Sequence, residues 1–244
     1  MEQALLELII IILLSAFQSI FGVGLLLFGT PLFLMIGYDF SSTLAMILPV
    51  SVLISFLQII YKSQLNKKCI VEYNLYTLPF LVFFLIISIK VNYFDIKLFV
   101  SVLLIISSLL VIMKNKIYSF KKYMHSHKKY ILMYIGSIHG LTNMGGGFLS
   151  IFSSIINEEN KYLSRSYIAY GYFIMGLVQI TTIVFISKDS LSLFKWYYLI
   201  IPFCIFIPCQ KIFKIINNVI FIKLIYYLAF IYGCINLILY KLWS

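Results

Sequence analysis

Long stretches without charge alternate with short polar segments along the whole chain. The uncharged windows cover residues 8–38, 40–61, 73–89, 98–113, 130–157, 166–187, 196–210 and 224–240. A helix that crosses a bilayer needs about 20 mainly apolar residues, and lysines at its ends can reach the interface. The pattern therefore predicts an all-α polytopic membrane protein with about eight transmembrane helices.

Two windows are too long for one simple crossing. Residues 8–38 and 130–157 would form helices of about 46 Å and 42 Å, against a hydrocarbon core of about 30 Å. Glycines interrupt both windows, including three in a row at 145–147. Each glycine costs about 1 kcal/mol relative to alanine inside a helix. We therefore expect two broken helices, since irregular backbone at membrane depth survives only inside protein or beside a wet cavity.

The first break has its own helix-start signal. Gly22 and Gly24 loosen the chain, and Thr30 followed by Pro31 predicts an N-cap and a first helical position. The expected pieces are roughly 4–21 and 30–38, with Asp39, Ser41 and Ser42 capping the next helix. Further helices are expected at 41–61, 73–90, 94–113, 164–187, 193–213 and 217–240.

The two interrupted windows suggest an internal repeat. Placing 22–24 on 145–147 gives an offset of 123, and Gln58 meets Gln179 at an offset of 121 after a small gap. The expected organisation is a first transmembrane repeat at 1–113, a basic loop at 114–129 and a second repeat at 130–244. The halves run parallel if each broken helix crosses the membrane, and they are inverted if each broken helix is re-entrant.

The net charge of +11 changes the picture little. The lysines lie between the apolar windows, which is typical of topology signals facing anionic lipid and argues against nucleic-acid binding. Segment 114–129 carries six lysines and is predicted to be cytoplasmic, as is 62–72. The expected topology places 188–195 on the cytoplasmic side and 211–216 outside, although the latter also carries two lysines.

The chemistry expected at a broken helix is anion binding. The half-helix that follows a break presents free amides and the positive end of its dipole. Candidate substrate-binding residues lie at or next to a break: Gly22, Gly24, Thr30, Pro31, His139, Thr142, Asn143, Gly145, Gly146 and Gly147. Ser150, Ser153 and Ser154 follow the second break. The alternative is that these glycines serve helix packing.

Several single residues have two interpretations. His139 is an ionisable group within an interrupted window, where it could relay protons, bind substrate or hydrogen-bond a neighbouring helix. Gln18, Gln58 and Gln179 are uncharged ligands or interhelical hydrogen-bonding groups. Arg165, the single arginine, is either a gate for the second half or an interfacial anchor beside two glutamates at 158 and 159.

Motifs for catalysis are missing from the sequence. It contains no Walker lysine motif, no nucleophile–base pair and no metalloprotease motif. The four cysteines have no CxxC spacing. We therefore expect no enzymatic activity, no catalytic residue, no metal site and no cofactor.

The stretches FGVGLLLFGTPLFLMIGYDFSSTLAM (21–46) and GLTNMGGGFLSI (140–151) resemble the sulfite exporter TauE/SafE family of bacterial permeases. The resemblance extends over nearly the whole chain in length, span count and duplicated halves. It implies a multi-span inner-membrane protein that exports sulfite, organosulfonates or related small anions. The family's glycine and proline pattern falls on Gly22, Gly24 and Pro31, and on 145–147. Leu25, Leu26 and Ser154 depart from that pattern.

The sequence thus favours a secondary carrier or facilitator for a small anion, located in the cell inner membrane, with the lipid bilayer as its surroundings. The alternative is a membrane assembly or cofactor-handling factor without transport activity. The substrate, the direction of transport, the coupling ion and the oligomeric state, a homo-oligomer included, stay open.

Overall fold

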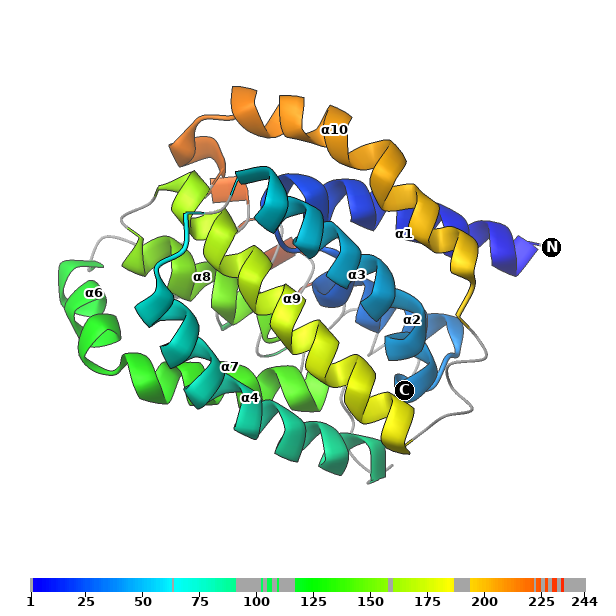
Figure 1. The fold of residues 1–244 in the computed structure, drawn as a ribbon, viewed down its shortest axis with the longest axis horizontal. Helices are drawn as coiled ribbons and strands as arrows, with labels where there is room; N and C mark the ends of the chain where they lie inside the picture. The colour runs from blue at the N-terminus through cyan, green and yellow to red at the C-terminus, as the bar shows by residue number, and fades with distance from the viewer. Residues whose placement is uncertain are drawn as a thin grey trace.

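A computed structural model describes residues 2–62, 64–90, 117–157, 160–186 and 194–221, with isolated positions of 102–109 and 223–234. The first helices are α1 (Glu2–Phe21), the π-helical η1 (Leu25–Gly29), α2 (Thr30–Ile36), α3 (Phe40–Lys62) and α4 (Lys67–Lys90). The later ones are α6 (Ile117–Ser126), α7 (Lys128–Thr142), α8 (Gly146–Ile156), α9 (Lys161–Ile186), the 3-10 helix η4 (Trp196–Leu199) and α10 (Ile200–Ile215). Every element in the described part is helical, as predicted (Figure 1).

Five of these helices are long and apolar enough to cross a membrane. They cover Gln3–Phe21, Phe40–Tyr61, Lys67–Lys90, Lys161–Ile186 and Trp196–Ile215. Two shorter apolar helices, Leu25–Ile36 and Gly146–Ile156, follow the two breaks. The architecture is compatible with a membrane protein. The helix expected at 94–113 and most of that expected at 217–240 lie outside the described residues.

The basic segment at 114–129 is not the loop that we predicted. Helix α6 covers Ile117–Ser126 and α7 already begins at Lys128. The segment contains no glycine or proline, and its lysines, tyrosines and methionine tolerate a helix. We predicted a loop because the segment is rich in lysine, but charge alone does not prevent helix formation.

The first interrupted helix folds back on itself. Phe17 on α1 contacts Phe28 on η1 edge to face, with ring centroids 5.2 Å apart. Further from the break, the Tyr38 hydroxyl after α2 donates a hydrogen bond of 2.5 Å to Glu7 on α1. The end of α2 therefore returns to the beginning of α1, and the unit is re-entrant.

The second interrupted helix folds back in the same way. Tyr134 on α7 and Phe148 on α8 pack edge to face at 5.7 Å. This hairpin has the opposite orientation to the first one, because α7 and α1 begin at opposite ends of the bundle. Helix α7 runs parallel to α4, since Lys128 pairs with Glu72 near their beginnings and Ser88 donates to the Leu141 carbonyl near their ends.

The bundle consequently has two chemically different ends. At one end, which we call the basic end, Lys214 lies over the Tyr61 ring and the Lys161 ammonium donates to the Phe213 carbonyl at 2.9 Å. Helices α4, α7 and α9 all begin there. At the opposite end, which we call the Glu7 end, α1 and α10 begin and α2 ends. In Figure 1 the basic end, with α6, is on the left, and the N-terminus is on the right.

This arrangement corrects the expected topology. Segment 211–216 lies at the basic end, on the same side as 62–72 and α6, whereas Lys195 lies at the opposite end beside Glu7. The prediction was wrong for the described residues, because Lys195 does not lie with the basic segment and 211–216 does not lie at the opposite end from it. It counted each interrupted window as one crossing, but a re-entrant hairpin leaves the chain on the side where it entered.

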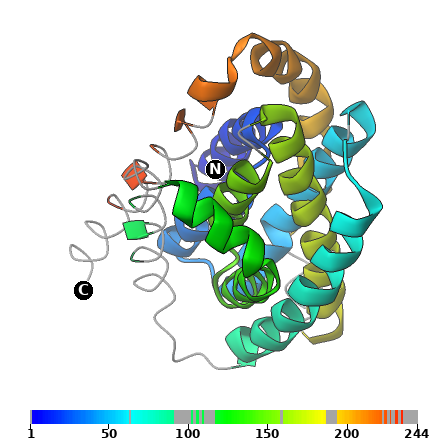
Figure 2. The ribbon, with the colours of Figure 1, turned by 90° about the vertical axis from the view of Figure 1, so that its left-hand side faces the viewer.

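Helices α3 and α9 pack antiparallel through the centre of the bundle, for example through Phe56 and Phe173 at 5.7 Å. Two outer pairs flank them, α4 with α7 and α1 with α10. Figure 2, viewed from the basic end, shows α10 and α4 on the outside of the bundle. Gly136 and Gly140 let α7 approach α4 closely, because a Cβ at either position would overlap the carbonyl oxygen of Thr77 or Leu81.

Candidate functional site

The second break begins with a left-handed residue. Helix α7 ends at Thr142, and Asn143 follows with φ of 60°. The backbone N–H of Asn143 donates to the His139 carbonyl at 2.8 Å. Asparagine is among the few non-glycine residues that adopt this conformation readily. After Met144 and Gly145, helix α8 begins at Gly146.

The first break has the same local geometry. Gly22 has φ of 81° and donates its amide to the Gln18 carbonyl at 2.8 Å. The Gly24 carbonyl then accepts from the Phe28 backbone amide at 2.8 Å, and the Gly145 carbonyl accepts from the Leu149 backbone amide at 2.9 Å.

These equivalent contacts all lie 121 residues apart, so the offset of 123 was wrong for the glycines. It aligned residues by glycine identity, whereas the left-handed residue is Gly22 at the first break and Asn143 at the second. With an offset of 121, Gln18 matches His139 and Gln58 matches Gln179 without a gap.

The glycines at the matched positions allow the returning chain to touch the helix that precedes it. A Cβ at Gly24 would lie 2.8 Å from the Gln18 amide nitrogen, and one at Gly145 would lie 2.8 Å from the His139 amide nitrogen. Both contacts are with backbone, which cannot move aside. Gly24 and Gly145 are therefore required by close packing.

Helix α2 begins at Thr30 with Pro31 in its first turn, as predicted, but the N-cap role predicted for Thr30 was wrong. Helix continues from Leu25 to Ile36, and Gly29 before Thr30 is already helical. The Thr30 hydroxyl donates back to the Leu26 carbonyl at 2.7 Å instead of capping. Amides after Pro31 lie inside a helix and cannot form the first anion site. The cap at the following helix is confirmed, because Asp39 Oδ1 accepts from the Ser42 amide at 2.9 Å.

Gln18 forms hydrogen bonds with several polar groups around the first break. Its Nε2 donates to Ser51 Oγ at 2.9 Å and to Ser55 Oγ at 3.1 Å. Its Oε1 accepts from the Leu25 amide, at the start of η1, at 3.2 Å. Gln58 Nε2 adds a bond of 2.8 Å to the Gln18 carbonyl. The first amide after this break is thus occupied by a side chain of the same hairpin.

Side chains at the second break keep several unpaired atoms, whereas Ser19 Oγ and Gln58 Oε1 are unpaired near the first. His139 Nε2 and Gln179 Oε1 are 3.2 Å apart, and the His139 and Tyr172 rings pack edge to face at 6.0 Å. All these residues are fully buried. Four atoms around the break have no hydrogen-bond partner in the described chain: His139 Nδ1, Asn143 Oδ1, Tyr172 Oη and Gln179 Nε2.

Tyr172 of α9 lies directly on the first turn of α8. A Cβ at Gly146 would overlap the Tyr172 hydroxyl and its ring. The Gly147 amide donates to the Met144 carbonyl at 3.1 Å, whereas the amides of Gly145 and Gly146 have no partner in the described chain. Free amides, the helix dipole and an unpaired phenol therefore meet at one buried point.

The other hydroxyl groups near the second break donate to backbone. Ser150 donates to the Gly146 carbonyl, Ser153 to the Ser164 carbonyl and Ser154 to the Ile151 carbonyl. Thr142 donates to the Ile138 carbonyl at 2.7 Å and accepts from the Met144 amide. These residues stabilise the break, and their hydroxyl hydrogens are already used.

The Arg165 side chain is buried inside the bundle. It is 4% exposed, and its guanidinium donates to Gln210 Oε1 at 2.7 Å and stacks on Phe213 at 3.6 Å. A Cβ at Gly22 would lie 3.2 Å from Arg165 Cγ, so the side chain is beside the first break. The glutamates at 158–159 lie outside the described residues. A gating role stays a prediction.

A scan against family models, a search of curated proteins and a search of solved structures each find no match. The residues of the second break therefore have to support any function on their own geometry. Within the described part of the chain, no group of three or more His, Cys, Asp or Glu side chains could hold a metal ion.

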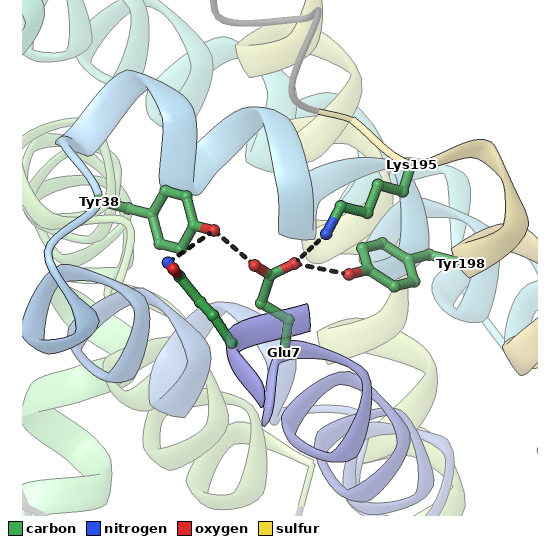
Figure 3. Close-up of polar contacts among 5 residues, drawn as sticks. Glu7, Tyr38, Lys195 and Tyr198 are labelled. Carbon is green, nitrogen blue, oxygen red and sulfur yellow. Dashed lines mark hydrogen bonds and ion pairs between the residues drawn. The ribbon is translucent and has the colours of Figure 1, made fainter. Parts of the chain in front are cut away.

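Sequence reasoning missed a second polar cluster, built around Glu7 (Figure 3). Glu7 is 2% exposed and accepts hydrogen bonds from the Tyr38 hydroxyl at 2.5 Å, Lys195 Nζ at 2.6 Å and the Tyr198 hydroxyl at 2.8 Å. Burial and this carboxylate raise the pKa of Tyr38 to about 12, so the phenol keeps its proton. The cluster joins α1, the turn after α2 and η4, which precedes α10.

Neither Glu7 nor Tyr172 carries a clear signal in the sequence. Glu7 lies just before an apolar window and resembles an ordinary interfacial charge. Tyr172 is one of 19 tyrosines in a chain where aromatic residues also suit membrane interfaces. A helical-wheel comparison of α9 would have placed Tyr172 and Gln179 on one face, because they are seven residues apart.

Proposed function

We propose that this chain is a membrane transporter, a secondary carrier or facilitator, that moves a small anion through a site at the second break. One observation carries the proposal. Buried polar atoms of His139, Asn143, Tyr172 and Gln179 have no partner in the described chain, and Tyr172 and His139 lie against the glycines with free amides at the start of α8. Leaving such groups unsatisfied costs about 1–3 kcal/mol each, so a polar ligand would stabilise them. Donors on a half-helix N-terminus favour an anion.

The proposed architecture is an inverted repeat. The two fold-back hairpins enter from opposite ends of the bundle, and their contacts correspond at an offset of 121. The outer pairs support this relation, since α1 packs with α10 as α7 packs with α4. Interrupted helices in corresponding positions of inverted repeats are typical of transporter binding sites. The repeat would comprise 1–113 and 130–244, with about eight spans when the residues outside the description are included.

The proposed topology places the basic end in the cytoplasm. Lysines of the α3–α4 connection, α6, the start of α7 and segment 211–216 gather there, which agrees with the positive-inside rule. The N-terminus would then lie on the outer side of the membrane. The proposed location of the protein is the inner membrane of a bacterium. The proposed substrate is sulfite, an organosulfonate or a related sulfur anion, moved outwards, by resemblance to the TauE/SafE family.

The test is anion flux in proteoliposomes, measured with purified wild-type chain and with the Gly146→Ala variant. The added methyl group would displace Tyr172 and cover the free amides, so flux and the ligand-induced rise in melting temperature should both disappear. A folded Gly146→Ala protein that transports sulfite at the wild-type rate would falsify the proposal.

The matched control is Gly29→Ala. Its Cβ would meet Leu14 Cδ1 at 3.3 Å, the end of a flexible side chain, and it lies after the first break. This variant should fold and keep its flux. Melting temperatures without anion separate a folding defect in either variant from a binding defect, because a ligand stabilises only the state that binds it.

A further inference from the structure

The second break offers unpaired acceptors as well as unpaired donors. Asn143 is the clearest case, because its amide orientation is fixed by its neighbours. The Thr30 hydroxyl uses its hydrogen on the Leu26 carbonyl, so Thr30 Oγ1 can only accept from Asn143 Nδ2, at 2.9 Å. Asn143 Oδ1 is therefore the free atom, and an amide oxygen is an acceptor only.

The His139–Gln179 pair leads to the same conclusion in either arrangement. If His139 Nε2–H donates to Gln179 Oε1, then His139 Nδ1 remains as an acceptor and Gln179 Nε2 as a donor. If the amide is flipped and the other tautomer is present, His139 Nδ1–H is a donor and the Gln179 oxygen an acceptor. One donor and one acceptor are left over in both cases.

No charged side chain balances the site. Among the described residues, the contacts of His139, Asn143, Tyr172 and Gln179 involve no Asp, Glu, Lys or Arg. Arg165 is engaged with Gln210 and Phe213 beside the first break. A dianion would therefore bring two charges to neutral groups and place an oxygen lone pair against at least one acceptor.

We infer that the site selects an oxyanion that carries one negative charge and one O–H group, such as hydrogensulfite, over its deprotonated dianion. Its oxygens accept from the free amides of Gly145 and Gly146, and its O–H donates to an acceptor such as Asn143 Oδ1. The inference rests on the proposed function, because it specifies the ligand of that same site. It predicts discrimination by protonation state, which a site made only of donors would not show.

The experiment measures apparent affinity by thermal shift for three probes: sulfite, selenite and methanesulfonate. Methanesulfonate keeps three oxygens and a single charge but has no O–H. We expect methanesulfonate to bind about tenfold or more weakly than hydrogensulfite, because one acceptor loses its hydrogen bond. The affinity for total sulfite should fall about tenfold per pH unit once hydrogensulfite has lost its proton.

The pH profiles identify where the proton resides. The titratable side chains facing the site are His139 on α7 and Tyr172 on α9, with Tyr73 on α4 packed against α9. If the ligand carries the proton, the midpoint lies at higher pH for selenite than for sulfite, because hydrogenselenite is the weaker acid. A midpoint common to both, or sulfite binding that strengthens with pH, overturns the inference.

A variant adds an independent readout. Asn143→Asp changes a neutral acceptor into a charged one while keeping the shape, and it should weaken methanesulfonate binding more than hydrogensulfite binding, because only hydrogensulfite can donate an O–H to the carboxylate. Equal binding of methanesulfonate and hydrogensulfite to the wild type also overturns the inference but leaves the proposed function in place. Absence of binding and flux for every anion tested contradicts the proposed function itself.

Discussion

Asn143 Nδ2 donates a hydrogen bond of 2.9 Å to Thr30 Oγ1 and so joins the two interrupted helices, although 113 residues separate them. Both side chains are fully buried. The bond sets the second break against the helix that follows the first, and it also fixes the orientation of the Asn143 amide. The two hairpins therefore depend on each other for the shape of the candidate site.

This link can be measured by a double-mutant cycle. Thr30→Val keeps the shape of the side chain but removes the acceptor, and we expect the free energy of unfolding to fall by about 1–3 kcal/mol because Asn143 Nδ2 is left unpaired. Asn143→Gly removes the side chain without straining the left-handed backbone. The double variant should be less destabilised than the sum of the two, with a coupling of about 0.5–3 kcal/mol. Additive effects would show that the bond is not formed.

Gly136 should tolerate no side chain. The Gly136→Ala methyl group would overlap the Thr77 carbonyl oxygen on α4, and backbone cannot turn away as a side chain can. We expect a loss of about 1–3 kcal/mol from overpacking, measured by thermal unfolding in detergent. Gly29→Ala serves as the control that should change stability little. Similar melting temperatures for the two variants would contradict the close approach of α4 and α7.

Glu7 should matter more for stability than any exposed ion pair. Lys195→Met removes one of three hydrogen-bonding partners of a carboxylate that is 2% exposed, while the Lys195 side chain is itself 31% exposed, and losing a hydrogen bond to a charged group costs about 1.5–3 kcal/mol. The matched comparison is Lys128→Met, which breaks the partly exposed pair with Glu72 and should cost about 1 kcal/mol or less. Thermal unfolding of both variants gives the difference. If the two variants are equally stable, the Glu7 cluster is not a stabilising element.

The two ends of the bundle should react differently with a membrane-impermeant maleimide. In a variant without the four native cysteines, Ala4→Cys marks the Glu7 end, whereas Ser126→Cys and Lys211→Cys mark the basic end; all three positions are exposed. In intact cells we expect Ala4→Cys to be labelled and the other two to be protected. Opposite labelling of Ser126→Cys and Lys211→Cys would instead support interrupted helices that cross the membrane.

Much of the helical architecture followed from local patterns. Apolar windows predicted helices close to the observed bounds of α3 and α9, and glycines located both breaks, because period and glycine cost are properties of short segments. The direction of the chain after each break could not be predicted. It depends on contacts between distant side chains, such as Glu7 with Tyr38 and Phe17 with Phe28. That single uncertainty reversed the side assigned to Lys195 and to 211–216.

The sequence by itself determined the helical class, the apolar spans, the positions of the two breaks and the concentration of lysine between spans. These depend on composition and on residues within a few positions of each other. Only the tertiary structure decided that both broken helices fold back and that Asn143 is the counterpart of Gly22. It also decided that Tyr172 and Gln179 meet His139 at the second break, because pairing of buried polar groups depends on which helices become neighbours.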